Sequence, residues 1–225
     1  MQMDFYTLPV LAYITGKLEK QSGKIRNGKN ITELDEGQIL ALLDLGKQNE
    51  LKLHRFKKTM GLPRIIKVLG HLQGFYPQNL LDIGTGRGVF LWPLLENLPY
   101  LEIHCTDILP QRIETLKLVQ KGGVKNIHPR LDNIKTLDYP DNAFDVVTFL
   151  ETLEHIPEPE TALMNALRMT KKALILSVPS KEDDNPEHIN LLEKSFFQKI
   201  LHSNPAFSLK FDHVPNHLII IYIRK

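Results

Sequence analysis

A ten-residue stretch, 79–88, combines an acid with three alternating glycines. Two apolar residues lead into Asp82, and Gly84, Gly86 and Gly88 follow it. A buried parallel strand that ends in a glycine turn and opens a helix has this pattern. Glycines let the backbone approach a ligand closely, because no Cβ stands in the way. A carboxylate before the turn is unfavourable for a pyrophosphate, but it favours a ligand that carries an ammonium group.

A second acid, Asp107, ends the next predicted strand, 21 residues after Gly86. A carboxylate there can accept two strong hydrogen bonds from the hydroxyls of a ribose. The same side chain could instead cap the helix that is predicted to begin near Pro110. Asp107 also fits the ribose of a nicotinamide dinucleotide, so it does not by itself distinguish between nucleotide ligands.

Strands and helices must alternate to position these acids, and from residue 79 onward the sequence predicts that they do. Apolar runs predict strands over 79–83, 101–106, 126–129, 144–150, 173–178, 208–213 and 217–224. Helices are predicted over 89–98, 110–121, 159–169 and 193–201. The last two strands are close in sequence, so they should pair antiparallel, whereas the earlier ones should be parallel.

The N-terminal part, 1–61, is predicted to be a separate helical segment that packs on the following domain as a cap. A short helix is expected over 8–18, a polar loop over 23–30, and two helices between 33 and 60 with Thr32 as a candidate N-cap. A further helix is expected over 63–72, at the start of the domain 62–225.

Composition limits the classes of function. The chain has 225 residues, 42% of them apolar, a net charge of +2 and one cysteine. This predicts one domain with an appendage, no internal disulfide, and no strong attraction to nucleic acid or membranes. The N-terminus lacks the pattern of a signal peptide, and the longest apolar run is too short to span a bilayer. We therefore expect a soluble cytoplasmic protein.

The segment 82–88, D-I-G-T-G-R-G, resembles motif I of the class I S-adenosylmethionine-dependent methyltransferases, [DE]-x-G-x-G-x-G. Val89 stands where a dinucleotide-binding motif has its third glycine. L-D-Y-P-D-N-A-F-D-V-V and E-T-L-E-H-I, around strand 144–150, also resemble this superfamily, although Lys171-Lys172 replaces its usual Gly-Gly. The resemblance implies a Rossmann-like α/β fold: a doubly wound, mostly parallel seven-stranded sheet with a C-terminal antiparallel hairpin.

The resemblance also implies S-adenosylmethionine as the cofactor and assigns residues to it. Asp107 would hold the ribose, Ile108 the adenine face, Asp132 and Asn133 the adenine amino group, and Glu151 would lie beside the sulfonium. The implied cofactor-binding residues are Asp82, Gly84, Thr85, Gly86, Gly88, Asp107, Ile108, Asp132, Asn133 and Glu151.

Glu154 and His155 are the candidate catalytic residues, and both are expected to face the substrate. His155 could act as a general base, or it could merely make a local hydrogen bond at the start of a helix. The pattern E-x-x-E-H with the downstream His188 is similar to the metal site of small-RNA 3′-terminal 2′-O-methyltransferases, but it also occurs in ubiquinone-biosynthesis O-methyltransferases. We predict no metal and an oxygen or carbon acceptor on a small molecule.

Three alternatives stay open at this point. The first is a metal-dependent RNA ribose 2′-O-methyltransferase, which the modest net charge disfavours. The second is a non-catalytic S-adenosylmethionine-binding module whose N-terminal helices contact a partner. The third is a nicotinamide-dependent dehydrogenase, which Val89 and Asp82 disfavour. No Asn-Pro-Pro-Tyr motif follows strand 144–150, which disfavours methylation of an amino group in DNA or glutamine.

Overall fold

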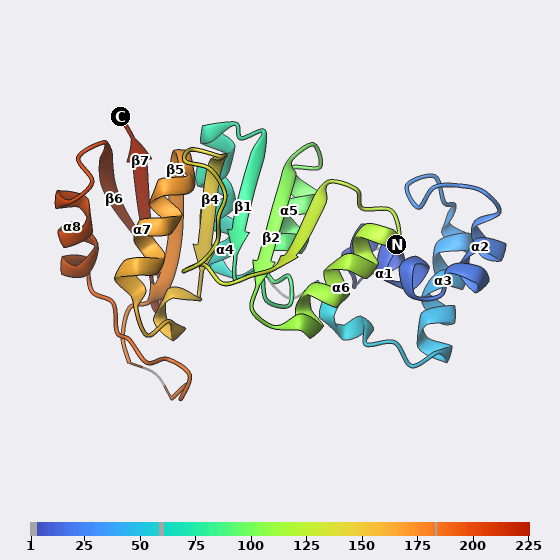
Figure 1. Cartoon of the computed structure of the whole chain (residues 1–225). Helices are drawn as coiled ribbons and strands as arrows, with labels where there is room; N and C mark the ends of the chain where they lie inside the picture. The colour runs from blue at the N-terminus through green and yellow to red at the C-terminus, as the bar shows by residue number, and fades with distance from the viewer. Residues whose placement is uncertain (1–3, 59–60, 183) are drawn as a thin grey trace.

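A seven-stranded sheet forms the centre of the protein in the computed structural model, which describes residues 4–58, 61–182 and 184–225 (Figure 1). The strand order is β3-β2-β1-β4-β5-β7-β6. The strands are β1 (Asn79–Ile83), β2 (Glu102–Asp107), β3 (Ile127–Leu131), β4 (Phe144–Leu150), β5 (Thr170–Pro179), β6 (Phe207–Val214) and β7 (His217–Arg224). The order reverses between β1 and β4, and at such a switch point open α/β sheets bind ligands.

The pairing of the strands confirms the predicted fold class. β1 to β5 pair in parallel, whereas β7 runs antiparallel to both β5 and β6. Every residue of β4 is buried, because helices cover both faces of the sheet and a central strand then needs apolar side chains on both sides.

Helices form a layer on each face. The helical elements are α1 (Thr7–Lys17), α2 (Glu19–Arg26), α3 (Glu36–Gln48), η1 (Leu53–Phe56), α4 (Pro63–Phe75), α5 (Leu91–Asn97), α6 (Pro110–Lys121), η2 (Leu153–His155), α7 (Pro159–Met169) and α8 (Lys194–His202). Leu80 and Val146 join one buried cluster with α1, α4, α5 and α6, and their neighbours Leu81 and Val147 join a second cluster with α7 and α8. This split follows from the alternation of side chains along a strand.

The N-terminal segment contains more helix than predicted. The expected loop over 23–30 is wrong in its first half, because α2 extends to Arg26. Asp35, and not Thr32, is the N-cap of α3, and its capping box with Gln38 is complete. The amide of Gln38 also donates to the carbonyl oxygen of Ile25 (2.9 Å), which satisfies an acceptor at the end of α2.

The helix α1 packs directly on α6, at the end of the molecule opposite the C-terminal hairpin (Figure 1). A Cβ built on Gly16 would collide with the backbone oxygen of Leu118, and one on Gly122 would collide with that of Ala12. The two helix backbones therefore approach so closely that only glycine fits at these positions. A division at residue 61 stays a prediction, since α1 and the sheet helices share one buried cluster.

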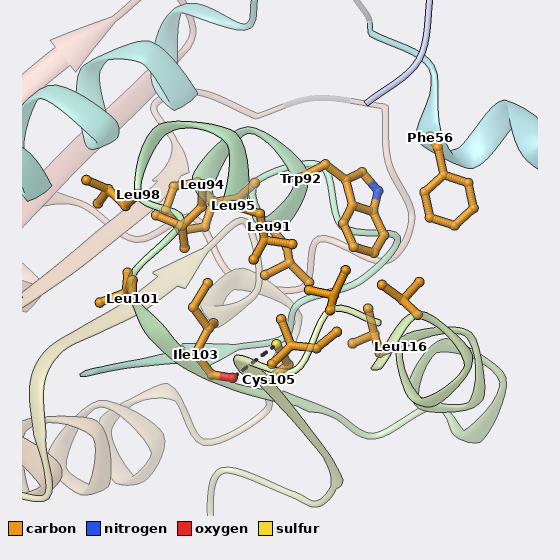
Figure 2. Close-up of a cluster of buried hydrophobic side chains, with 14 of the residues drawn as sticks. Phe56, Leu91, Trp92, Leu94, Leu95, Leu98, Leu101, Ile103, Cys105 and Leu116 are labelled. Atoms are coloured by element: carbon orange, nitrogen blue, oxygen red, sulfur yellow. Dashed lines mark hydrogen bonds between the residues drawn. The ribbon is translucent and has the colours of Figure 1, made fainter. Parts of the chain in front are cut away.

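Phe56 of η1 packs against Trp92 of α5 (Figure 2) and against Tyr13 of α1. The centroid of the Phe56 ring lies 5.1 Å from that of Trp92 and 5.2 Å from that of Tyr13. The side chains of Phe56 and Trp92 are almost fully buried, and each is worth about 3–5 kcal/mol against truncation to alanine. Among the described residues, no helix combines the length and apolar character needed to cross a bilayer.

Lys171-Lys172, the departure from the methyltransferase pattern, has a structural partner. The ammonium of Lys172 lies 3.0 Å from a carboxylate oxygen of Asp145, and that of Lys171 lies 3.5 Å from the other. Asp145 also accepts from the amide of Gln78 (2.9 Å). The two lysines thus neutralise a buried acid that ties β4 to the start of β1.

We predict opposite effects of the same substitution in two helices. Gly16→Ala should lower the free energy of unfolding by about 1–3 kcal/mol, because its methyl group meets the backbone of α6. Gly70→Ala, in α4, should raise the free energy of unfolding by about 0.5–1 kcal/mol, since no atom lies within 4 Å of the added methyl group. Urea denaturation of both variants measures the difference, and a Gly16→Ala protein as stable as wild type would contradict the close α1–α6 contact.

Candidate functional site

A cavity of about 720 Å³ opens at the carboxyl ends of β1, β2 and β4. The predicted residues that line it are Asp82, Gly84, Thr85, Gly86, Asp107, Ile108, Asp132, Asn133, Glu151 and His155. Gly88 and Glu154 are not among the lining residues. The topology thus brings together side chains that are up to 73 residues apart (155 − 82) in the sequence.

The glycine turn after β1 contains glycines of two kinds. Gly86 has a φ of +63° and lines the cavity, and a Cβ there would make only ordinary contacts with Gly84 and Arg112. Gly88, which we predicted to bind the cofactor, is not among the residues that line the cavity. Its φ is +83°, and a Cβ there would collide with the indole of Trp92, so Gly88 lets the turn pack on α5 instead of lining the cavity.

Asp82 lies at the bottom of the cavity and is almost completely buried. The hydroxyl of Thr148, on β4, donates to its carboxylate (2.7 Å). Burial raises the pKa of Asp82 to about 6, although this hydrogen bond opposes the shift, because desolvation disfavours the charged form. A ligand with a positive charge next to Asp82 would offset that cost.

Asp107 connects three parts of the site. Its carboxylate accepts from the amide of Gly86 (2.9 Å) and from that of Leu109 (2.9 Å), and it lies 3.1 Å from the guanidinium of Arg112. The side chain is buried but borders the cavity. Leu109, and not Asp107, is the N-cap of α6, so the predicted helix cap is wrong, whereas ribose binding by Asp107 stays a prediction.

Beyond Asp107 the cavity has an apolar wall and a polar rim. Ile108 lines the cavity and is 65% exposed, so its apolar side chain is accessible to a ligand. Asp132 lies 2.7 Å from the guanidinium of Arg130 and accepts from the amide of Asn133 (2.7 Å). These contacts orient the Asp132 carboxylate at the edge of the cavity.

At the end of β4, Glu151 adopts a left-handed conformation with φ of +48°. The hydroxyl of Ser177 donates to one of its carboxylate oxygens (2.7 Å), and Nε2 of His217 lies 3.0 Å from the other. His217 begins β7, and the antiparallel pairing of β5 with β7 places it opposite Pro179, close to this acid. The sequence offered no signal for His217, because this contact depends on the register of the hairpin.

Glu154, His155 and His188 form a cluster beside the cavity, and only His155 lines it. Glu154 is completely buried, so its carboxylate does not face the cavity as we expected. The carbonyl oxygen of Glu187 lies 2.7 Å from Nδ1 of His155, and because a carbonyl only accepts, Nδ1 carries the proton. Nε2 of His155 is therefore the basic nitrogen.

The cluster has the donor set of a divalent metal site. One ligand atom from each of the three residues lies within 4.8 Å of the others, and Glu151 is not part of the group. Two imidazoles and one carboxylate suit zinc, manganese or similar ions better than magnesium. The hydrogen bond to Glu187 resembles the contacts that orient metal-ligating histidines.

Part of the chain is similar to known methyltransferases. Residues 81–173 match the family model described as a methyltransferase domain. A demethylmenaquinone methyltransferase of Deinococcus radiodurans is 38% identical over 74 residues, which are 32% of this chain and 30% of that protein. A ubiquinone biosynthesis O-methyltransferase of Colwellia psychrerythraea is 31% identical over 102 residues, or 44% and 39% of the two chains. The chain thus covers less than half the length of these relatives.

Solved structures show the same fold. A SAM-dependent methyltransferase from Aquifex aeolicus has a TM-score of 0.57 with 19% identity, over 74% of this chain and 100% of that one. The N-terminal domain of EvdMO1 with SAH bound also has a TM-score of 0.57, with 16% identity, over 73% and 82% of the two chains.

The buried carboxylate predicts a pH dependence of stability. Because folding raises the pKa of Asp82, the folded protein binds this proton more tightly than the unfolded chain does. The free energy of unfolding should therefore fall as the pH rises from about 4 to about 6, by on the order of 3 kcal/mol from this group, and then level off. Asp82→Asn should remove that fall. Chemical denaturation between pH 4.5 and 7 tests it, and parallel curves for the two proteins would refute the assignment.

Proposed function

Because the chain contains a domain of the class I S-adenosylmethionine-dependent methyltransferase superfamily, we propose that it transfers a methyl group from S-adenosylmethionine to an oxygen or carbon atom of a small molecule. One observation carries this proposal. The cavity is lined in sequence order by a buried acid, a glycine turn and a second strand-end acid, all at the switch point of the sheet.

Each part of the cavity has a proposed role toward this cofactor. The amino-acid end would lie by Asp82 and the glycine turn, where a positive charge offsets the burial of the carboxylate. Asp107 would accept from the ribose hydroxyls, and the exposed face of Ile108 would be covered by the adenine. Asp132 and Asn133 would hold the adenine amino group, and Glu151 would lie beside the sulfonium.

S-adenosylmethionine supplies an electrophilic methyl group on a positively charged sulfur. The protein then has to hold the acceptor in line with that bond and to exclude water. For a hydroxyl acceptor, Nε2 of His155 is the proposed general base, because its lone pair is free while Nδ1–H donates to Glu187. It takes the hydroxyl proton as the oxygen bonds to the methyl carbon, and the sulfur keeps the electron pair of the broken bond. Glu154 is buried, and it is proposed to act together with His155, because a carboxylate oxygen of Glu154 lies within 4.8 Å of a ring nitrogen of His155.

The acceptor is proposed to be an aromatic ring or ring hydroxyl. The names of several relatives contain quinone-type compounds, among them a 2-methyl-6-phytyl-1,4-hydroquinone methyltransferase of Synechocystis that is 33% identical over 133 residues. The net charge of +2 and the single, buried Cys105 support a cytoplasmic enzyme that has no nucleic-acid partner.

Calorimetry with S-adenosylhomocysteine tests the proposal. We expect Asp107→Ala to weaken binding by about 1–3 kcal/mol, through the loss of charge-assisted hydrogen bonds. Asp141→Ala is the matched control, because Asp141 also pairs with an arginine (Arg168, 2.8 Å) but does not line the cavity. Wild-type protein that binds NADH but not S-adenosylhomocysteine would support a dehydrogenase instead. Binding without turnover on a panel of phenols and hydroquinones would favour a non-catalytic module.

A second candidate, metal-assisted transfer to a ribose hydroxyl of RNA, is favoured by the Glu154–His155–His188 cluster. A relative named as a tRNA N(3)-methylcytidine methyltransferase, 30% identical over 115 residues, also acts on RNA by its name.

Chelation separates the two candidates. If His155 acts as a general base, turnover should be unchanged after EDTA treatment and gel filtration. If a metal acts, turnover should fall about tenfold or more and return with Zn²⁺ or Mn²⁺, and His188→Ala should lower the metal content measured by plasma mass spectrometry.

A further inference from the structure

A second, smaller cavity of about 330 Å³ lies next to the proposed cofactor cavity. The two share four residues of the glycine turn and of the start of α6: Gly86, Arg87, Leu109 and Arg112. The segment around η1 closes the other side of the smaller cavity. We call it the basic pocket, because Lys52, His54, Arg55, Arg87 and Arg112 line it.

The positive charges of the basic pocket are largely uncompensated. No aspartate or glutamate lines it. Arg112 pairs with Asp107, whereas in the described ranges no acid lies within ion-pair distance of Lys52, Arg55 or Arg87. Three cations without an acidic partner around one cavity create a positive potential that attracts anions.

The basic pocket is held in shape by buried groups. The indole N–H of Trp92 donates to the carbonyl oxygens of both Arg55 (3.2 Å) and Arg87 (3.1 Å), so one buried ring fixes the backbones of two arginines from distant segments. Phe56 packs on the same ring (Figure 2). The guanidinium of Arg55 donates to the hydroxyl of Thr115 on α6 (3.0 Å), which orients it. A preformed site loses less entropy on binding.

The start of α6 adds to the attraction for anions. This helix has 12 residues, and Leu109 and Gln111 at its N-terminal end line the basic pocket. The N-terminus of a helix carries a partial positive charge. The forked guanidinium groups match the oxygens of a phosphate better than a single ammonium does.

We propose that the basic pocket binds a small molecule that carries phosphate groups, and that Arg112 couples its binding to that of the cofactor. The volume suits one or two phosphates with a small organic group. Arg112 lies between the cavities, with its guanidinium 3.1 Å from the Asp107 carboxylate and about 4.0 Å from the position of a Cβ on Gly86.

The coupling follows from competition for one carboxylate oxygen. The oxygen of Asp107 that pairs with Arg112 also accepts from Gly86, so it has little capacity left for a ribose hydroxyl. A phosphate in the basic pocket would draw the guanidinium of Arg112 toward itself and release that acceptor. Each ligand then strengthens the binding of the other, as linkage requires. The coupling to the cofactor rests on the proposed function, whereas phosphate binding itself does not.

Trp92 reports on the basic pocket directly, because it is the only tryptophan of the chain and lines the cavity. Titration of the full chain with pyrophosphate, followed by Trp92 fluorescence and calorimetry, should give saturable binding. Arg55→Gln and Arg87→Gln should each weaken it about tenfold or more. Lys210→Gln is the control, because it removes an equal charge from the exposed surface of β6, and it should leave binding unchanged.

Three results would overturn phosphate binding: no saturable binding at millimolar pyrophosphate, equal binding by the two arginine variants and wild type, or equally tight binding of citrate. Coupling is tested with S-adenosylhomocysteine, which should bind about fivefold tighter in saturating pyrophosphate, and Arg112→Gln should abolish this gain. An unchanged affinity in wild type would overturn the coupling alone. Failure of S-adenosylhomocysteine to bind at all would instead refute the proposed function and leave the pyrophosphate result standing.

Discussion

The carboxylate of Asp107 is the contact on which the site depends. It ends β2, holds the glycine turn after β1 through the amide of Gly86, and holds the approach to α6 through the amide of Leu109. Three chain segments therefore take their positions from one buried anion. Such an anion is stable only when it is fully hydrogen-bonded, and Arg112 supplies the opposite charge. Asp107 lines the ligand cavity, and its partner Arg112 lines both that cavity and the basic pocket.

Much of the fold could be predicted because the sheet is governed by local rules. The bounds of β1, β4, α6, α7 and β7 agree with the expectation, since apolar runs flanked by Pro, Gly or Asn mark them clearly. The N-terminal helices were harder. The polar sequence of α2 has no apolar stripe, and that helix is stabilised by contacts such as that of Gln38 with the carbonyl oxygen of Ile25, from 13 residues away.

The sequence predicted those residues of the candidate site whose positions depend only on the order and direction of the strands. Asp82, Asp107 and Glu151 follow parallel strands, and the carboxyl ends of such strands meet at one edge. Packing decided the rest. Gly88 lies against Trp92, and Glu154 is completely buried. Neither placement can be derived from the spacing of residues in the sequence. Arg112 and His217 were missed because their partners lie on elements whose relative placement only the three-dimensional structure determines.

The position of the N-terminal segment has a consequence for the site. The segment was predicted to pack on the domain as a cap. In the structure α1 packs on α6, while Lys52, His54 and Arg55, in and just before η1, line the basic pocket next to the glycine turn. That placement depends on Trp92, whose indole N–H is shared by carbonyls of η1 and of the turn. Because Gly88 has no Cβ, the same indole can lie against the turn itself. Gly88 thus leaves room for the ring that holds the backbones of two arginines of the basic pocket in place.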